Sequence, residues 1–231
     1  MHFTVGRTFE LFQKIYLSPD TNISVLEIGS QNFNGGLRDL KMPNLEWLGI
    51  DMEAGPGVDT VVQIGSSFPF ENATFDLVLC SSVFEHDIRF WNTFLEMARV
   101  TKPQGVLLLI MPSQGLFHLY PLDAFRFYPD AGIALEKWAD SQGLATKLVE
   151  SFTTKPEKDV FADFVAIFSE SPSNFTDKMI GGELMGENWI IQGELQTDTF
   201  QEFPYELRRI KELEERIASM RLKLQEFVQE L

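Results

Sequence analysis

Short apolar runs alternate with amphipathic stretches along most of the chain, and this alternation defines the elements we expect. Helical spacing of apolar residues marks residues 90–100 and 130–142, and each stretch stops at a proline or glycine that ends a helix. Seven other runs are rich in β-branched or large apolar residues and have the length of buried strands. They are residues 24–28, 46–50, 60–62, 75–80, 105–111, 145–151 and 161–169.

Strands separated by crossover helices are typical of the doubly wound α/β fold. The last two strand candidates, 145–151 and 161–169, are joined by too few residues for a helical crossover, so they should pair as an antiparallel hairpin. We therefore expect a Rossmann-like, mostly parallel, seven-stranded sheet that ends in this hairpin.

The pattern changes near the C-terminus, where apolar residues step alternately by three and four positions. This heptad seam, with charged residues around it, favours a coiled coil and hence a homo-oligomer or a partner helix. The alternative is an amphipathic helix docked on its own domain. We expect an α/β domain over 1–170, a linker or flap over 171–203 and a coiled-coil helix over 204–231. The seam residues are Ile210, Leu213, Ile217, Met220, Leu224, Phe227 and Leu231.

Charge argues against a nucleic-acid partner. The formal net charge is -15, and acidic and basic residues balance in 204–231, so the excess acid lies in residues 1–203. That part also has no cluster of lysine and arginine, so it should repel a phosphate backbone.

Cysteine usage and hydropathy suggest an intracellular protein. The chain has 1 cysteine, Cys80, which rules out an intramolecular disulfide framework and a cysteine-clustered zinc site. No apolar run reaches the roughly 18 residues of a membrane span, and charges interrupt the N-terminal stretch, so no signal peptide is expected. We expect a cytoplasmic location.

The stretch "GSQNFNGGL" after the first strand is the first candidate for ligand binding. Gly29 allows a tight turn, and Gly35 precedes an expected helix, so backbone N–H groups could approach a ligand closely. The second strand ends in Asp51, where a doubly wound fold presents an acid to the hydroxyls of a ribose. Together they favour binding of a nucleotide-like cofactor. The alternatives are that the glycine-rich turn binds nothing and that Asp51 only caps a helix or a turn.

Six motifs in order resemble the class I S-adenosylmethionine-dependent methyltransferases over roughly residues 20 to 170. The resemblance implies a methyltransferase domain in 1–170 with S-adenosylmethionine as cofactor. Two departures are Gln31 and Phe33 where glycines are usual, and Ile64 where many relatives carry an aspartate that contacts adenine. The motifs are Glu27-Ile28-Gly29, Asp51, Phe68-Pro69-Phe70, Phe75-Asp76-Leu77-Val78, Glu85-His86 and Lys102-Pro103-Gln104-Gly105.

By position, the resemblance also implies how the cofactor would lie. The loop after the first strand would hold the methionine part, the acid of the second strand the ribose, and later turns the adenine and the sulfonium. The implied residues are Glu27, Gly29, Ser30, Gln31 and Gly35 for the methionine part, Asp51 for the ribose, Met52 for the adenine face, Gly65 and Ser66 for its edge, and Cys80 and Ser81 beneath the sulfonium.

The acceptor should bind beyond the carboxyl ends of the fourth and fifth strands. His86 and His118 fall in these loops and either could act as a base, with Asp87 placed to orient His86. No metal-ligand set stands out, so no metal is expected. The loop of His118 resembles the lining of a site for a polar, ring-shaped acceptor such as a sugar, unless an Asp123–Arg126 pair simply locks it. Its further members are Tyr120, Asp123, Arg126 and Tyr128.

The leading hypothesis is an O-methyltransferase for a small molecule or a glycan, and relatives of this pattern often accompany polysaccharide modification. The alternative is a degenerate methyltransferase fold that acts as a scaffold through its coiled coil. A nicotinamide-dependent oxidoreductase is disfavoured by the terminal hairpin and by the segment "FDLVLCSSVFEH".

Overall fold

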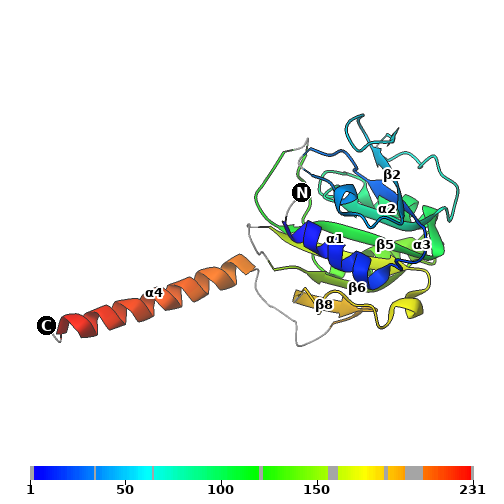
Figure 1. Cartoon of the computed structure of the whole chain (residues 1–231). Helices are drawn as coiled ribbons and strands as arrows, with labels where there is room; N and C mark the ends of the chain where they lie inside the picture. The colour runs from blue at the N-terminus through cyan, green and yellow to red at the C-terminus, as the bar shows by residue number, and fades with distance from the viewer. Residues whose placement is uncertain are drawn as a thin grey trace. The chain divides into compact units, whose positions relative to one another are not determined.

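The computed structural model describes residues 3–33, 35–63, 65–119, 122–155, 161–184, 187–195 and 205–229. Its described strands form a nine-stranded sheet in the order β3-β2-β1-β4-β5-β7-β6-β8-β9 (Figure 1). The strands are β1 (Ile23–Ile28), β2 (Leu45–Asp51), β3 (Thr60–Val61), β4 (Phe75–Ser81), β5 (Thr101–Gln114), β6 (Lys147–Thr153), β7 (Ala162–Ser169), β8 (Glu187–Ile191) and β9 (Glu194–Leu195).

The sheet is mixed, which corrects the expectation of a mostly parallel, seven-stranded one. The pairings from β3 to β5 are parallel, whereas those from β5 to β9 are antiparallel. The hairpin of β6 and β7 is confirmed. The difference arises in the segment expected to be a linker or flap, because β8 and β9 extend the sheet beyond β6.

Helices cover both faces of the sheet, as a doubly wound fold requires. The helices α2 (Phe90–Val100) and α3 (Asp130–Ser141) confirm the two predicted stretches and pack on one face. The opposite face is covered by α1 (Phe3–Tyr16), which the sequence analysis did not predict. Its side chains Phe9 and Phe12 are fully buried against that face.

The connection after β1 differs from the expected crossover helix. A helix was expected after Gly35 and Gly36. The chain forms only the short 3-10 helix η1 (Leu37–Leu40) there before β2 begins. The loop uses most of the residues between the two strands, so too few remain for several helical turns. No long helix therefore points its N-terminus at this loop.

A buried carboxylate, Glu150 on β6, joins segments from both ends of the α/β unit. Its Oε1 accepts hydrogen bonds from the Tyr16 hydroxyl and the Ile180 amide, both at 2.8 Å. Its Oε2 accepts from the Gly181 amide at 3.1 Å and from Trp189 Nε1 at 2.8 Å. These bonds hold α1, the segment before β8 and β8 itself to the centre of the antiparallel half.

The C-terminal residues form a unit of their own, Phe200–Leu231, separate from the unit Met1–Thr199. Its helix is α4 (Tyr205–Gln229), which confirms a helix in this region. The seam side chains that the structure describes are exposed, at 51% for Ile210, 41% for Leu213, 51% for Ile217 and 62% for Met220. Their pairing with another helix remains a prediction. Among the described helices, none combines the length and apolar character needed to cross a bilayer.

Replacing Glu150 tests this anchor. In Glu150→Gln the amide NH2 group must face two hydrogen-bond donors, so we expect the free energy of unfolding to fall by about 3 kcal/mol. Urea denaturation measures this loss. The control is Glu170→Gln at an exposed position, which should change stability by less than about 0.5 kcal/mol. Equal stability of the two variants would contradict the anchoring role.

Candidate active site

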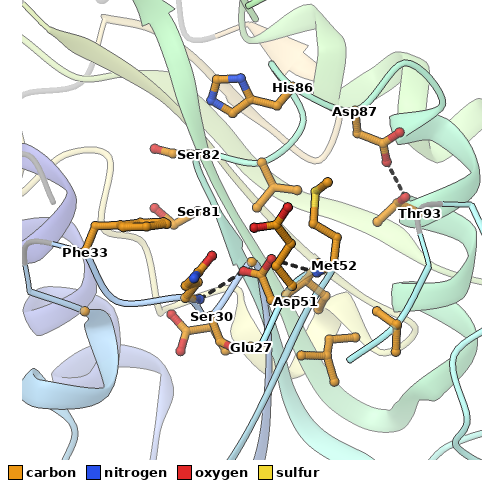
Figure 2. Close-up of a pocket in the computed structure, with 18 of the residues that line it drawn as sticks. Glu27, Ser30, Phe33, Asp51, Met52, Ser81, Ser82, His86, Asp87 and Thr93 are labelled. Carbon is orange, nitrogen blue, oxygen red and sulfur yellow. Dashed lines mark hydrogen bonds between the residues drawn. The ribbon is translucent and has the colours of Figure 1, made fainter. Parts of the chain in front are cut away.

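A pocket of about 560 Å³ opens at the carboxyl ends of β1, β2 and β4 (Figure 2). Strand β1 pairs in parallel with both neighbours, with Ile28 opposite Ile50 on β2 and opposite Cys80 on β4. The residues that follow these positions, Gly29 and Asp51 among them, are thereby brought to one edge of the sheet. The pocket lies where a doubly wound sheet places its ligands.

The turn at Gly29 needs a glycine for two reasons. Its φ is 74°, in the left-handed region, and a Cβ there would lie 2.1 Å from Val83 Cγ2. The Gly29 amide donates to the Ile50 carbonyl at 2.9 Å, which continues the β1–β2 pairing into the turn. Further on, Asn32 Oδ1 accepts from the Gly35 amide at 2.8 Å and closes the loop. The described residues of the loop are therefore held by hydrogen bonds, although the usual series of glycines is missing.

The carboxylate of Asp51 ties the loop to the end of β2. Its Oδ2 accepts the Gln31 amide at 3.0 Å and its Oδ1 accepts the Met52 amide at 2.7 Å. Both bonds fix its orientation at the pocket wall. Beside it, the hydroxyl of Ser30 is buried and has no hydrogen-bond partner among the described residues. A buried hydroxyl without a partner is unusual and calls for an explanation such as a ligand.

Glu27 places a buried carboxyl group in the same pocket. The side chain is 7% exposed, and its Oε2 accepts a hydrogen bond from Trp47 Nε1 at 2.8 Å. Burial raises the pKa of the Glu27 carboxyl to about 7, although the Trp47 hydrogen bond acts in the opposite direction. A positively charged ligand group would favour the ionised form.

Most of the expected cofactor residues line the pocket, including Met52, Gly65 and Ser81. Two do not. The Ser66 hydroxyl donates to the Gln63 carbonyl at 2.7 Å, and Cys80 is enclosed in the core at 1% exposure. Ile64 lies outside the described residues.

Four polar lining residues were not expected from the sequence, because no motif marks them: Glu53, Gln63, Ser82 and Thr93. Phe33 also lines the pocket. Its side chain is 58% exposed and therefore does not fill the pocket.

His86 and Asp87 both line the pocket, and His86 lies at the opposite end of the labelled group from Glu27 (Figure 2). Asp87 does not contact His86 through a hydrogen bond that the structure records. It accepts hydrogen bonds from the Arg89 amide and the Thr93 hydroxyl, so it holds the start of α2. The His86 ring stands 5.1 Å from the ring of His118, measured between centroids.

The loop after β5 is held by its own charged pair. The Arg126 guanidinium donates twice to Asp123, whose side chain is fully buried, and the His118 amide donates to the same carboxylate at 2.9 Å. The Arg126 hydrogen bonds hold the pKa of the Asp123 carboxyl well below its usual range. Asp123, Arg126 and Tyr128 are not among the pocket-lining residues, and Tyr120 lies outside the described residues.

Among the described residues of this loop, the most exposed side chains are apolar, although Tyr128 is also 57% exposed. Leu116, Phe117 and Leu119 are 65%, 71% and 68% exposed, and Leu119 also lines the pocket. The loop thus offers an acceptor apolar surface, while its charged groups are engaged with each other.

Comparison with known proteins finds methyltransferases among the proteins that this chain resembles. Residues 40–109 match a family model described as a methyltransferase domain. The ubiquinone/menaquinone biosynthesis C-methyltransferase UbiE of Ruegeria sp. (strain TM1040) is 27% identical over 138 residues, which cover 58% of this chain and 54% of that protein. The chain thus spans about half the length of this curated relative.

Two solved structures share the fold. One is described as a sarcosine dimethylglycine methyltransferase from Galdieria sulphuraria, with a TM-score of 0.51 and 12% identity over 73% of this chain and 85% of that one. The other comes from the complex of the Haloferax volcanii Trm112 methyltransferase activator with its methyltransferase, with a TM-score of 0.50 and 12% identity over 71% of this chain and 89% of that one.

Residues 40–109 thus resemble a methyltransferase domain, and the two solved structures share the fold of the chain.

The raised pKa of Glu27 predicts how the stability of the folded protein depends on pH. Burial raises the pKa of Glu27 from its ordinary value of 4.5 to about 7, so the neutral carboxyl costs little stability at low pH, and the folded protein loses stability as the pH rises from 4.5 to 7. Glu27→Gln has no charge to bury. We expect it to be more stable than the natural protein by about 3 kcal/mol at pH 8, and by less than about 1 kcal/mol at pH 5.

Urea denaturation at both pH values measures the difference. Glu46→Gln, at an exposed position on β2, serves as the matched control and should change stability by less than about 0.5 kcal/mol at either pH. A Glu27→Gln effect of equal size at pH 5 and pH 8 would show that burial of the charge is not its cause.

Proposed function

We propose that this protein transfers a methyl group from S-adenosylmethionine to a hydroxyl oxygen of a small-molecule acceptor. The observation that carries the proposal is the pocket at the carboxyl ends of β1, β2 and β4, into which Glu27, Gly29 and Asp51 all face. Its volume of about 560 Å³ lies within the range of small-molecule and cofactor sites.

The residues of the pocket suit the parts of this cofactor. Asp51, already oriented by two amides, would accept hydrogen bonds from the ribose hydroxyls. The carboxyl of Glu27 and the unpartnered Ser30 hydroxyl would meet the polar methionine part. The exposed Met52 side chain, at 43%, would cover the adenine. These proposed roles follow the family resemblance and are supported by the hydrogen bonds and the burial of the residues in this chain.

The chain's part in the reaction is alignment and proton removal. When bound, S-adenosylmethionine supplies a methyl group on a positively charged sulfur, which an acceptor oxygen can displace. His86 lines the acceptor side of the pocket and can accept the hydroxyl proton at Nε2, since its Nδ1 faces the Leu122 carbonyl. Asp87 supports this position by holding the start of α2 rather than the ring itself.

The acceptor that fits this lining is a hydroxyl compound with an apolar framework. The expected sugar-binding groups, Asp123 and Arg126, are paired with each other, and the most exposed of the described loop residues are apolar. Neither the comparisons nor these contacts favour a glycan. The curated relative is named a C-methyltransferase, so transfer to carbon is the second candidate, and product analysis distinguishes the two.

For the domain organisation, we propose a catalytic domain that continues past residue 170 to include β8 and β9, followed by a self-associating helix. The exposed apolar seam of α4 supports the second part, because such a stripe is stable in water only when another helix covers it. If no acceptor is ever found, the same helix supports the alternative of a methyltransferase-fold scaffold.

Cofactor binding is tested by calorimetric titration of the full chain with S-adenosylhomocysteine. We expect micromolar binding, weakened by about 10- to 100-fold in Asp51→Asn, which loses one acceptor oxygen for the ribose. Glu46→Gln on the same strand is the control and should bind like the natural protein. Absence of binding at millimolar ligand, or equal affinity of the two variants, would contradict the proposal.

Self-association through α4 is tested by sedimentation equilibrium. Ile217→Asp places a charge in the seam and should convert oligomers to monomers, since burying an unpaired charge is costly. Ser219→Asp adds the same charge two positions away, off the seam, and should leave the oligomer intact. A natural protein that is monomeric at high micromolar concentration would contradict the coiled coil.

A further inference from the structure

Three side chains that can bind a metal converge beside the pocket, and one of them, His86, also lines it. Glu85 and His86 belong to the turn after β4, and His118 comes from the loop after β5. One ligand atom from each lies within 4.8 Å of the others. Glu85 Oε1 is 3.7 Å from His86 Nε2, and the two imidazole rings meet edge to face. The fold therefore brings the ring of His118 to two neighbouring residues, Glu85 and His86, that lie more than 30 positions earlier in the sequence.

Glu85 is the unusual member of this group. Its side chain is 1% exposed, and among the described residues neither carboxylate oxygen accepts a hydrogen bond from another residue; only the backbone amide of Glu85 itself acts on the carboxylate. A buried carboxylate without hydrogen bonds is costly unless a cation or a metal ion pairs with it. By contrast, Glu150 on β6 is equally buried and receives four hydrogen bonds. The free oxygens of Glu85 thus point to a missing partner.

The two histidines are oriented as metal-binding histidines usually are. Nδ1 of His86 faces the Leu122 carbonyl, and Nδ1 of His118 lies 3.2 Å from the Leu116 carbonyl. A histidine that binds a metal through one ring nitrogen commonly donates the other N–H to a backbone carbonyl or a carboxylate. The Asp123 carboxylate adds a second such partner, 3.5 Å from His118 Nδ1. Nε2 of each ring remains as the ligand atom.

Charged groups of both signs act on Glu85. The guanidinium of Arg126 favours its ionised form, and the carboxylates of Asp123 and Asp163 disfavour it. Arg126 is itself bound to Asp123. The ligand side chains, and not the surrounding charge, therefore make this place suitable for a cation.

We propose that Glu85, His86 and His118 bind one divalent transition-metal ion of the zinc type. Two imidazoles and a carboxylate with an open fourth position form a known ligand set for zinc. Bonds of about 2.1 Å in tetrahedral geometry separate neighbouring ligand atoms by about 3.4 Å. The 3.7 Å between Glu85 Oε1 and His86 Nε2 requires only a small adjustment.

The position suggests what the ion does. His86 lines the pocket, so an open coordination position there can receive an acceptor oxygen and favour its deprotonated form. His86 would then be a ligand rather than the base. This role rests on the proposed function, whereas binding of the ion does not.

The test uses the full chain without a histidine tag, first treated with a chelator. Titration with Co2+ is followed by visible absorption, and titration with Zn2+ by calorimetry. We expect one equivalent of each ion and the intense visible bands of a four- or five-coordinate cobalt site. In Glu85→Gln and His118→Gln, the affinity for the metal ion should fall by at least about 100-fold. Loss of a residue that only supports a ligand costs up to about 100-fold, and loss of a ligand itself should cost at least as much.

His2→Gln is the matched control, since His2 is the remaining histidine of the chain and is outside the proposed ligand set; it should bind as the natural protein does. Far-UV circular dichroism and thermal unfolding confirm that each variant is folded. The proposal is overturned if cobalt shows only the weak bands of its hydrated ion, or if the two ligand variants bind as tightly as the control. Titration with S-adenosylhomocysteine is separate: its failure overturns the proposed function and leaves the metal result standing.

Discussion

The parallel pairing of β1 with β2 on one side and with β4 on the other is the constraint on which the pocket depends. Because the three strands run in the same direction and in register, their carboxyl ends lie at one edge of the sheet. The turn at Gly29 then has no room for a side chain against Val83, and the carboxylate of Asp51 can reach the amide of Gln31. These contacts hold the turn in place, although the usual glycines are missing. A continuous series of glycines is therefore not required to form this turn.

Three buried glutamates show how differently one side chain can be used in one fold. Glu150 receives four hydrogen bonds and anchors the antiparallel half of the sheet. Glu27 receives one from Trp47, and Glu85 receives none from another of the described residues. Burial raises the pKa of Glu27 to about 7 and that of Glu85 to about 8, so both keep a proton near neutral pH unless a cation compensates. Incomplete hydrogen bonding in a pocket wall is a useful sign of a ligand, because the fold has left that group for something else to satisfy.

Polar residues near the acceptor side are not all available for chemistry. Asp87 is used at the start of α2, and the Asp123–Arg126 pair closes the loop after β5. The same loop exposes Leu116 and Phe117. The acceptor site is therefore less polar than its sequence indicates, and the nature of a loop depends on which of its groups are already paired.

The sequence by itself determined the strands that carry the pocket, the helix α2 and the acid at the end of β2, because these rest on local periodicity and on short motifs. It did not predict α1, whose charged residues obscure the apolar face that packs on the sheet, or β8, which is a strand only because β6 provides an edge. It wrongly predicted a helix after Gly36, since loop length and not propensity decided that connection. The cluster of Glu85, His86 and His118 was decided by the tertiary structure alone, because its members come from two loops that meet only when β4 and β5 pair.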